Sequence, residues 1–462
     1  MIFSSLTFLL IFLPITLLLY YIVPKKAKNF ILLLCSLIFY AWGEPVYILL
    51  MLYSIFLNYI CGRMMEKHES ARKQILIFGI ILNLFLLGFF KYAGFLTESA
   101  NRLLEPLGVS IPLREIALPI GISFYTFQAL SYLIDLYRGK FPAQKGLISF
   151  ALYITMFPQL IAGPIVRYES IAEELSNREL SMEKFGRGAV IFIEGLAMKV
   201  LLANQIGVIA DELRAMSGTL STTSAWLSTL AYFFQIYFDF AGYSTMAIGL
   251  GHMLGFTFCK NFDHPYLSTS VTDFWRRWHM SLGTWFREYV YIPLGGNRVS
   301  VAKHIRNILV VWILTGLWHG AAWNFVLWGL YYGLLLLFEK YVFSRIKIPK
   351  AIGWVYTTIL VLIGWVLFSS ENLPQCISIL GAMFGAGTGL WDKTAMYYLT
   401  TGGFILLICA LCSTPLLGLL KDKLLRRLPG RIVVGVIYVG LFALSLLFLV
   451  VQNYNPFLYF RF

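Results

Sequence analysis

Charged side chains are scarce in this sequence. Asp, Glu, Lys and Arg make up 13% of the 462 residues, whereas 59% of the residues are hydrophobic. Soluble domains carry about 25% charged residues, so the composition excludes an ordinary soluble protein and predicts an integral membrane protein. The chain also lacks a hydrophilic linker, an internal repeat and a low-complexity segment. We therefore expect a single membrane domain over residues 1–462.

Several motifs of soluble enzymes are absent as well. The sequence contains no G-x-S-x-G elbow, no P-loop and no dinucleotide-binding fingerprint. Its six cysteines give no disulfide framework, and the CxxC spacing of Cys409 and Cys412 lies inside an apolar run, which favours a packing role. No histidine motif supplies enough metal ligands. We expect neither a metal site nor a bound cofactor.

Long apolar runs are what the chain has instead, and they predict an all-α, polytopic membrane protein. A helix of about 20 apolar residues crosses the hydrocarbon core. The candidate spans are residues 2–23, 29–42, 46–61, 75–96, 116–137, 147–163, 186–210, 225–258, 307–338, 351–369, 398–420 and 431–451. The short runs 29–42 and 147–163 favour re-entrant or tilted elements. The run 225–258 is too long for a simple crossing and carries Gln235, Asp239 and His252, so we expect it to bend or divide. This pattern predicts about 11 transmembrane helices plus re-entrant and interfacial amphipathic helices.

The basic residues predict the orientation of the chain. The net charge is +14, and basic clusters follow the first, third and fifth spans, at 25–28, 63–73 and 138–145. The turns between them are neutral or acidic, at 44–45 and 98–115. Because cytoplasmic loops carry the excess of Lys and Arg, we expect an extracytoplasmic N-terminus. The first span lacks a cleavage site and is expected to be retained. No nucleic-acid partner is expected, since no separate basic domain exists.

Residues 261–306 differ most from their surroundings. Ser270 or Thr272 can cap a helix that carries Asp273 in its first turn. Its apolar face would hold Phe274, Trp275, Trp278, Leu282, Trp285, Phe286 and Tyr289, and its polar face Asp273, Arg276, Arg277, Ser281, Thr284, Arg287 and Glu288. His279 lies near the border of the two faces. The pattern predicts an amphipathic helix over 270–292 at a membrane boundary, which either lies flat on lipid or folds inward.

One histidine stands inside an apolar run, in Gly316-Leu317-Trp318-His319-Gly320. An ionisable side chain at membrane depth is costly unless it faces protein, water or a partner, so it marks either a helix-to-helix contact or a functional site. On one continuous helix, Trp312, Thr315 and Trp323 would share its face. We expect a cavity there, lined by Trp312, Thr315, Trp318, Trp323 and Asn324. With an ordinary pKa near 6.5, the imidazole suits general-base catalysis.

The remaining polar residues of interest are expected to be structural. Asp239 lies within the 225–258 run, and we expect its carboxylate to form a hydrogen bond between two helices. His264 precedes a proline and is typical of a turn. His68 and His304 lie among basic residues and are expected to be solvated.

Five internal stretches and the C-terminus resemble the membrane-bound O-acyltransferase family, most of all its bacterial alginate O-acetyltransferase branch. They are Pro119–Arg138, Phe157–Tyr168, Gln235–Gly251, Phe274–Arg298, Gly316–Asn324 and the closing NYNPFLYFRF. The resemblance spans nearly the whole chain, with core motifs at about 116–330. Thr245 and Glu288 stand where the family pattern has Asp.

The resemblance implies an activity and roles for particular residues. An acetyl group would leave a cytoplasmic thioester, acetyl-CoA, for a hydroxyl and end on an extracytoplasmic polysaccharide such as alginate. By the same resemblance His319 is the essential histidine and acts as general base, and His279 is the second motif histidine. Arg276, Arg277 and Arg287 would hold the donor's phosphates, because guanidinium groups make bidentate phosphate contacts. The implied location is the bacterial inner membrane.

The implied partners are membrane lipids, an exported acetyl-transfer protein and a polysaccharide-synthesis complex. Other functions stay open on the sequence. Within enzymes, the alternative is D-alanyl transfer from a carrier-protein thioester. In other classes, the alternatives are a transporter of an acyl donor or precursor, and a docking subunit without catalysis. A transporter would favour paired half-repeats with broken helices, and a docking subunit would tolerate loss of His319.

Overall fold

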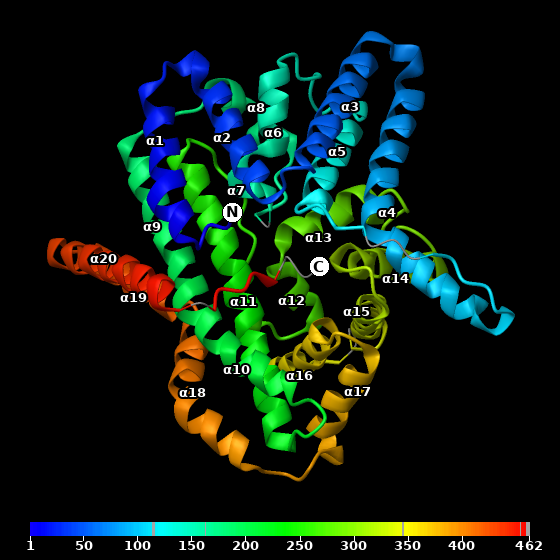
Figure 1. Ribbon diagram of the computed structural model, residues 1–462, viewed down its shortest axis with the longest axis vertical. Helices are drawn as coiled ribbons and strands as arrows, with labels where there is room; N and C mark the ends of the chain where they lie inside the picture. Colours follow the sequence, from blue (N-terminus) through cyan, green and yellow to red (C-terminus); the bar gives the residue numbers. More distant parts are fainter. Residues whose placement is uncertain (113–115, 162, 344–345, 453, 459–462) are drawn as a thin grey trace. The chain divides into compact units, whose positions relative to one another are not determined.

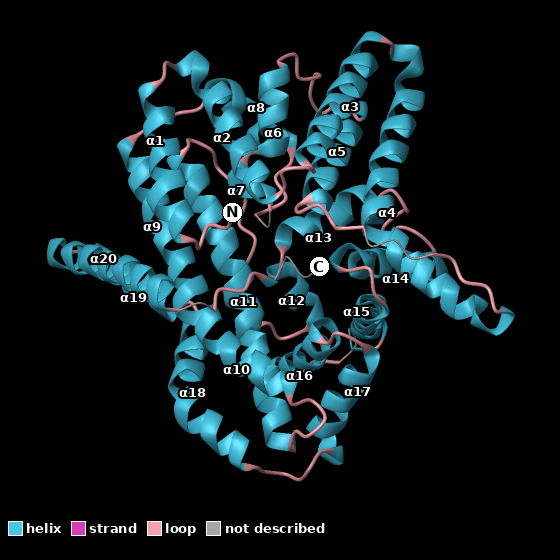
Figure 2. Ribbon diagram, viewed as in Figure 1, coloured by secondary structure: helices cyan, strands magenta, loops and turns pink. Residues whose placement is uncertain are grey.

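A computed structural model describes residues 1–112, 116–161, 163–343, 346–452 and 454–458. The described residues form helices and loops, without a strand (Figures 1 and 2). They group into two compact units, the first containing 1–189 and 247–259 and the second 190–246 and 260–462. Stretches singled out above fall partly outside the described residues: Glu115, Ala162, and positions 453 and 459–462 of the C-terminal motif. The single domain expected over 1–462 stays a prediction.

The first unit is built from the N-terminal helices. They are η1 (Phe8–Phe12), α1 (Leu13–Ile22), α2 (Lys28–Gly43), α3 (Ile48–Lys67), α4 (Arg72–Leu104), α5 (Ile122–Tyr137), α6 (Leu147–Thr155), α7 (Phe157–Leu160), α8 (Tyr168–Asn177) and the start of α9 (Met182–Ala197). Helix α5 lies beside α3 and α4 (Figure 1) and is buried on nearly every side. It begins after Gly121, which has a φ of 76°. A Cβ atom at this position would stand 2.7 Å from the Leu160 carbonyl oxygen, so the turn requires glycine.

The second unit contains the remaining helices. They are η5 (Met198–Ala203), α10 (Asn204–Ala215), most of α11 (Thr222–Met253), α12 (Val271–Arg277), α13 (Met280–Phe286), η7 (Arg287–Tyr291), α14 (Val301–His319), α15 (Trp323–Tyr341), α16 (Lys350–Ser369), α17 (Leu373–Gly381), η9 (Ala382–Ala386), α18 (Lys393–Cys412), α19 (Leu416–Leu425) and α20 (Leu428–Val451). Polar side chains cap three of them: Ser270 accepts from the Asp273 amide, Asn372 from the Gln375 amide and Asp392 from the Ala395 amide. Cys409 is buried in α18, and its thiol is free.

Six helical stretches in the described part of the chain are long and apolar enough to cross a membrane. They are Ile48–Lys67, Glu69–Leu107, Met182–Ala215, Lys350–Ser369, Lys393–Cys412 and Leu428–Val451. The last exposes large apolar side chains, among them Val436 at 66% and Val439 at 71%. Such a surface is unfavourable in water and suits contact with lipid. The protein is therefore an all-helical membrane protein, and η1 with α1 forms a shorter apolar helix over Phe8–Ile22.

Residues 222–253 of the run 225–258 form one helix, α11, so the run does not divide within them, and the chain has left the helix at Gly255, whose φ is 89°. The expectation of a bend or a division relied on the length of the run and on its polar residues. The second unit satisfies one of them directly: the Asp239 carboxylate lies 2.5 Å from the Lys199 ammonium and accepts from the Leu458 amide at 3.1 Å. A buried carboxylate with these partners does not require the helix to open.

The run 307–338 is not one span but a helical hairpin. Helix α14 ends at His319, Gly320 is extended, and α15 begins at Trp323. The two helices lie side by side (Figure 1) because glycines form their contact. A Cβ atom on Gly316 would stand 2.2 Å from the Phe325 carbonyl oxygen, and one on Gly329 would stand 2.2 Å from that of Trp312. Only glycine permits this approach, and the approach places His319 at the end of a helix.

Candidate active site

The amphipathic segment at 270–292 is broken at its histidine, so the prediction of one continuous helix is wrong. Helix α12 ends at Arg277, α13 begins at Met280, and His279 between them has a φ of 45°. The left-handed conformation is sparsely populated by non-glycine residues, and such residues often occur at functional sites. The segment is not flat on a surface, since His279 is 2% exposed and the aromatic side chains of both helices are mostly buried. Ser270 provides the cap of α12, accepting from the Asp273 amide at 3.0 Å.

Asn261 holds the turn that carries His279. Its backbone carbonyl accepts from the Met280 amide, and its side-chain Oδ1 accepts from the Ser281 amide at 3.1 Å and from the Ser281 hydroxyl at 2.9 Å. The same Oδ1 lies 3.2 Å from His279 Nδ1, and Asn261 Nδ2 donates to the Ser244 hydroxyl. Because a backbone N–H donates to this atom of Asn261, the atom must be the amide oxygen. His279 Nδ1 therefore donates to it.

This hydrogen bond determines the tautomer of His279. With the proton on Nδ1, the lone pair of the neutral ring is on Nε2. Nε2 is buried and has no hydrogen-bond partner among the described residues. Burial lowers the pKa of His279 to about 3, so the ring is neutral at physiological pH. The turn thus presents a neutral imidazole with an available proton-accepting nitrogen.

His319 lies beside His279, within a cluster of aromatic side chains. The two imidazole ring centroids are 6.5 Å apart. Trp318, Trp328 and Phe368 surround the His319 ring at centroid distances of 5.0, 5.1 and 5.2 Å. Trp318 also lies 5.8 Å from the His279 ring, and the edge of Phe240 packs against that ring at 4.6 Å. The second unit therefore brings together the two histidines that the sequence singled out, and both are buried in a largely apolar setting.

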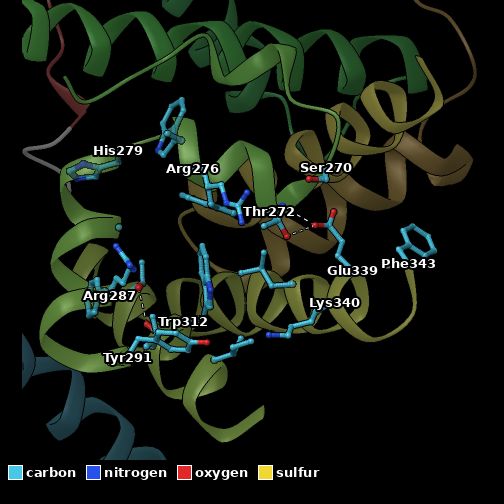
Figure 3. A pocket seen from close by; sticks show the side chains of 18 of the residues that line it. Ser270, Thr272, Arg276, His279, Arg287, Tyr291, Trp312, Glu339, Lys340 and Phe343 are labelled. Atoms are coloured by element: carbon cyan, nitrogen blue, oxygen red, sulfur yellow. Dashed lines mark hydrogen bonds between the residues drawn. The ribbon is translucent and has the colours of Figure 1, made fainter. Parts of the chain in front are cut away.

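A cavity of about 800 Å³ begins at His279. Figure 3 shows His279 and Arg287 on one side of it and Glu339 and Lys340 on α15 at the other. The volume lies within the ~300–1,000 Å³ typical of small-molecule sites. Its lining combines aromatic and aliphatic side chains with cationic ones, which suits a ligand with an anionic part and an apolar part.

The predicted arginines do not all reach this cavity. Arg276 and Arg287 line it, together with Lys340, which the sequence analysis did not select. Arg277 does not line it and instead forms an ion pair with Asp273 at 3.0 Å. Lys340 escaped notice because a lysine at the end of an apolar run usually marks only the membrane boundary.

The one carboxylate in the cavity lining is already committed to other groups. Glu339 is buried and accepts hydrogen bonds from the Val271 and Thr272 amides at 2.6 and 2.8 Å, and from the Thr272 hydroxyl at 2.6 Å. These contacts place its negative charge at the N-terminus of α12, where the helix dipole favours it. Glu339 therefore does not pair with the cations of the cavity: Arg287 forms its own ion pair with Glu288 at 3.5 Å, whereas Arg276 and Lys340 have no carboxylate oxygen within 4.0 Å among the described residues.

His304 was expected to be solvated, and this is wrong. It is 3% exposed on the first turns of α14 and lines the same cavity. Its Nε2 lies 3.0 Å from the Tyr291 hydroxyl and 3.3 Å from Lys340 Nζ, and its Nδ1 lies 2.7 Å from the Tyr341 hydroxyl. Neighbouring lysines and arginines in the sequence suggested a loop, whereas only the packing of α14 on α15 reveals this network.

The predicted cavity-lining residues divide into two groups. Trp312 and Thr315 line the cavity. Trp318 contacts both histidines, but Trp318, Trp323 and Asn324 do not line this cavity. Trp323 is 48% exposed, and the helix break at Gly320 removes the shared face that it was expected to form with His319. Asn324 donates to the Ser370 carbonyl oxygen and links α15 to the end of α16.

The sequence analysis also missed how the C-terminal residues are held. Lys199, 1% exposed in η5, pairs with Asp239 and donates to the Pro456 carbonyl oxygen. Tyr454 donates to Asp211 at 2.6 Å, and Phe457 packs on Tyr243 at 4.7 Å. Asp239 therefore joins two helices, as expected, and also holds the chain end through the Leu458 amide.

The sequence of the chain is similar to those of known acyl-transfer enzymes. Residues 143–371 match the model of the membrane-bound O-acyltransferase family. The chain is 38% identical to a probable alginate O-acetylase of Pseudomonas putida, with 100% of both chains covered. It is 35% identical to a peptidoglycan O-acetyltransferase of Helicobacter pylori, over 83% of this chain and 80% of the relative. It is 28% identical to a teichoic acid D-alanyltransferase of Bacillus subtilis, over 54% and 69%.

The match to the alginate and peptidoglycan enzymes extends far beyond the two histidine motifs and includes most of both compact units. The helical membrane fold, the paired buried histidines and these similarities lead to one conclusion. The chain belongs to the membrane-bound O-acyltransferase family and is an O-acyltransferase.

Proposed function

We propose that the protein transfers an acetyl group from acetyl-CoA to a hydroxyl group, for O-acetylation of an extracytoplasmic polysaccharide such as alginate. The observation that carries the proposal is the pair of buried histidines, with ring centroids 6.5 Å apart, of which His279 lines a cavity together with Arg276, Arg287 and Lys340. The cations suit the phosphates of a CoA donor, and the apolar lining suits its pantetheine arm. The names of two relatives, an alginate O-acetylase and a peptidoglycan O-acetyltransferase, support acetyl transfer to a polymer.

In the proposed reaction His319 acts as the general base. It takes the proton of the acceptor hydroxyl, whose oxygen then bonds to the acetyl carbon of the thioester. The carbon–sulfur bond breaks, and the proton held by His319 passes to the departing CoA sulfur. The neutral His279 ring, held by Asn261 beside His319, would help to position the reacting groups for this step. The closed aromatic surroundings would keep water from hydrolysing the thioester.

The proposal includes a topology and a location. We propose about 11 transmembrane helices in the bacterial inner membrane, with the N-terminus outside and the basic loops in the cytoplasm. The cavity would then open to the cytoplasm for the donor, while the acceptor reaches His319 from the other side. An exported acetyl-transfer protein and a polysaccharide-synthesis complex would carry the acetyl group onward.

A direct test follows the acetyl group. Purified protein in proteoliposomes is given acetyl-CoA labelled in the acetyl group, together with candidate acceptor proteins or alginate. We expect labelled acceptor from wild type and almost none from His319→Ala. Absence of transfer from acetyl-CoA to every acceptor, by a wild-type protein that stays folded, would contradict the proposal.

D-alanyl transfer from a carrier protein is the alternative within the family, supported by the 28% identity to the teichoic acid enzyme. The two donors can be compared in the same assay. Transfer of labelled D-alanine from a carrier thioester, without transfer from acetyl-CoA, would favour the alternative.

A further inference from the structure

A second pocket, of about 450 Å³, lies wholly within the first unit, apart from the histidines. Residues from the turn before α2, from α6 and from the end of α8 line it. They are Lys25, Lys26, Lys28, Asn29, Ser149, Leu175, Ser176, Arg178 and Leu180. Four cationic side chains therefore share one small cavity, with hydroxyl and amide groups between them. Neither the proposed acyl transfer nor the similarity to known proteins gives this pocket a role.

Arg178 and Lys28 are built firmly into the pocket. Arg178 donates from Nε to the Tyr20 hydroxyl at 2.5 Å and from Nη1 to Asn29 Oδ1 at 2.6 Å. Its Nη2 is buried and has no hydrogen-bond partner among the described residues. Lys28 is 9% exposed, donates to the Tyr20 carbonyl oxygen and lies over the Tyr20 ring. The Arg178 guanidinium also lies over the Phe256 ring, 4.7 Å from its centroid. A guanidinium and an ammonium that line one pocket favour an anionic ligand.

The positive charge of the pocket is not neutralised by the protein. Among the described residues, none of the four cations has a carboxylate oxygen within 4.0 Å, and Lys25 donates to the neutral Asn177 side chain instead. Glu174, one turn before Arg178 in the sequence, accepts from the Thr257 amide and faces Lys184 at 3.9 Å. Burial and the charge of Arg178 lower the pKa of Lys28, as expected where like charges lack a counterion.

Exposed apolar side chains flank the pocket. Phe30 follows Asn29 and is 52% exposed, Ile148 precedes Ser149 and is 45% exposed, and Ile22, one turn before Lys25, is 71% exposed. In a membrane protein such residues contact acyl chains. A basic cavity beside an apolar surface matches a molecule with a phosphate at one end and hydrocarbon at the other.

We propose that this pocket binds a phosphate group, and that the phosphate is the headgroup of an anionic membrane phospholipid. Arg178 and Lys28 would contact the phosphate oxygens, Lys25 and Lys26 would close over them from outside, and the acyl chains would lie along the exposed faces of α1, α2 and α6.

The test measures lipid binding by the full-length protein in an uncharged sugar detergent. Mixed micelles containing phosphatidylglycerol, or phosphatidylcholine with the same acyl chains, are titrated, and the rise of the thermal unfolding midpoint gives an apparent affinity. We expect a saturable rise with phosphatidylglycerol and little with phosphatidylcholine. Lys25→Gln with Lys26→Gln should weaken the phosphatidylglycerol affinity about tenfold, since each interfacial cation contributes modestly. Both lysines are exposed, so the double variant should fold normally.

The matched control is Lys67→Gln with Lys73→Gln, which removes the same charge from exposed positions outside the pocket. This control should bind phosphatidylglycerol as wild type does, and Lys25→Arg with Lys26→Arg should retain binding. Equal weakening by the control would overturn the site, because binding would then follow net charge alone. If inorganic phosphate raised the thermal unfolding midpoint as much as phosphatidylglycerol does at equal phosphate concentration, the assignment of the ligand as a lipid would be overturned.

Discussion

The two buried histidines of the second unit are held in different ways. His279 stands on a left-handed turn, where a hydrogen bond to Asn261 sets its tautomer and directs the Nε2 lone pair away from Asn261. His319 ends a helix whose close packing on α15 depends on glycine, and its ring lies among Trp318, Trp328 and Phe368. The comparison shows two means of preorganisation: a polar clamp fixes protonation and direction, whereas an aromatic enclosure fixes position and excludes water.

The largest expected effect is the loss of His319. His319→Ala should lower the rate of acetyl transfer by about 10²–10⁴-fold, the range that general acid–base catalysis contributes. Donor binding should be unchanged, because His319 does not line the basic cavity. Single-turnover transfer and equilibrium binding of acyl-CoA measure the two separately. His279→Ala should also be impaired, and near-normal transfer by a folded His319→Ala protein would remove the general-base assignment.

The next effect tests the polar clamp without changing either histidine. Asn261→Ala leaves His279 Nδ1 and both donors of Ser281 without their acceptor. We expect kcat to fall about 10–100-fold through misplacement of His279, with a smaller change in KM. A loss of about 1–3 kcal/mol in stability is also expected, because buried polar groups lose their partner.

Asn261→Asp separates positioning from a general loss of structure. The carboxylate still accepts from His279 and Ser281, so part of the rate should return. It also places a negative charge beside His279, which raises the histidine pKa, so the acid limb of the pH–rate profile should move to higher pH. A profile identical to wild type would show that His279 does not take part in transfer.

The third effect concerns pH and stability. His279 lies outside the six candidate spans, and burial lowers its pKa from 6.5 to about 3. The folded protein therefore binds this proton more weakly than the unfolded chain, and acid favours unfolding between pH 6.5 and 3. When the pH falls from 7.5 to 5.5, the free energy of unfolding of the wild type should decrease by ~1.4 kcal/mol because of His279. The His279→Gln variant should not show this decrease. Thermal unfolding at the two pH values measures it, with the exposed His68→Gln as control.

The sequence predicted the parts of the fold that follow from composition and local pattern. The membrane class and the helical content follow from the apolar runs. The cap at Ser270 follows from a local contact, because its hydroxyl accepts from the amide three residues later. The breaks at His279 and Gly320 were missed, because helical periodicity continues through both positions in the sequence. The unbroken α11 was missed for the opposite reason: Asp239 finds its partner Lys199 about 40 residues earlier in the chain, which periodicity cannot show.

For the site, too, the features that follow from local sequence pattern could be predicted, and those that depend on contacts between distant residues could not. His279 and His319 could be selected because histidines are rare in apolar runs and both stand in the family's motifs. Asn261, Lys340 and His304 could not, since each acts through contacts between elements distant in the sequence. Arg276 could not be separated from Arg277, its neighbour on α12, because only the packing of the helices shows which of the two lines the cavity.

The smallest expected effect therefore tests the three arginines against one another. Arg276→Gln and Arg287→Gln should each raise KM for acyl-CoA about threefold to fivefold, because exposed cations contribute little individually, and should leave kcat nearly unchanged. Arg277→Gln removes the same charge from the same segment, but the Arg277 side chain does not line the cavity. The Arg277→Gln variant should therefore have the KM of the wild type. Steady-state kinetics at several acyl-CoA concentrations measure KM for all three variants. An equal rise in KM for Arg277→Gln would mean that the donor responds to the overall charge of the segment, and the assignment of its phosphates to this cavity would then fail.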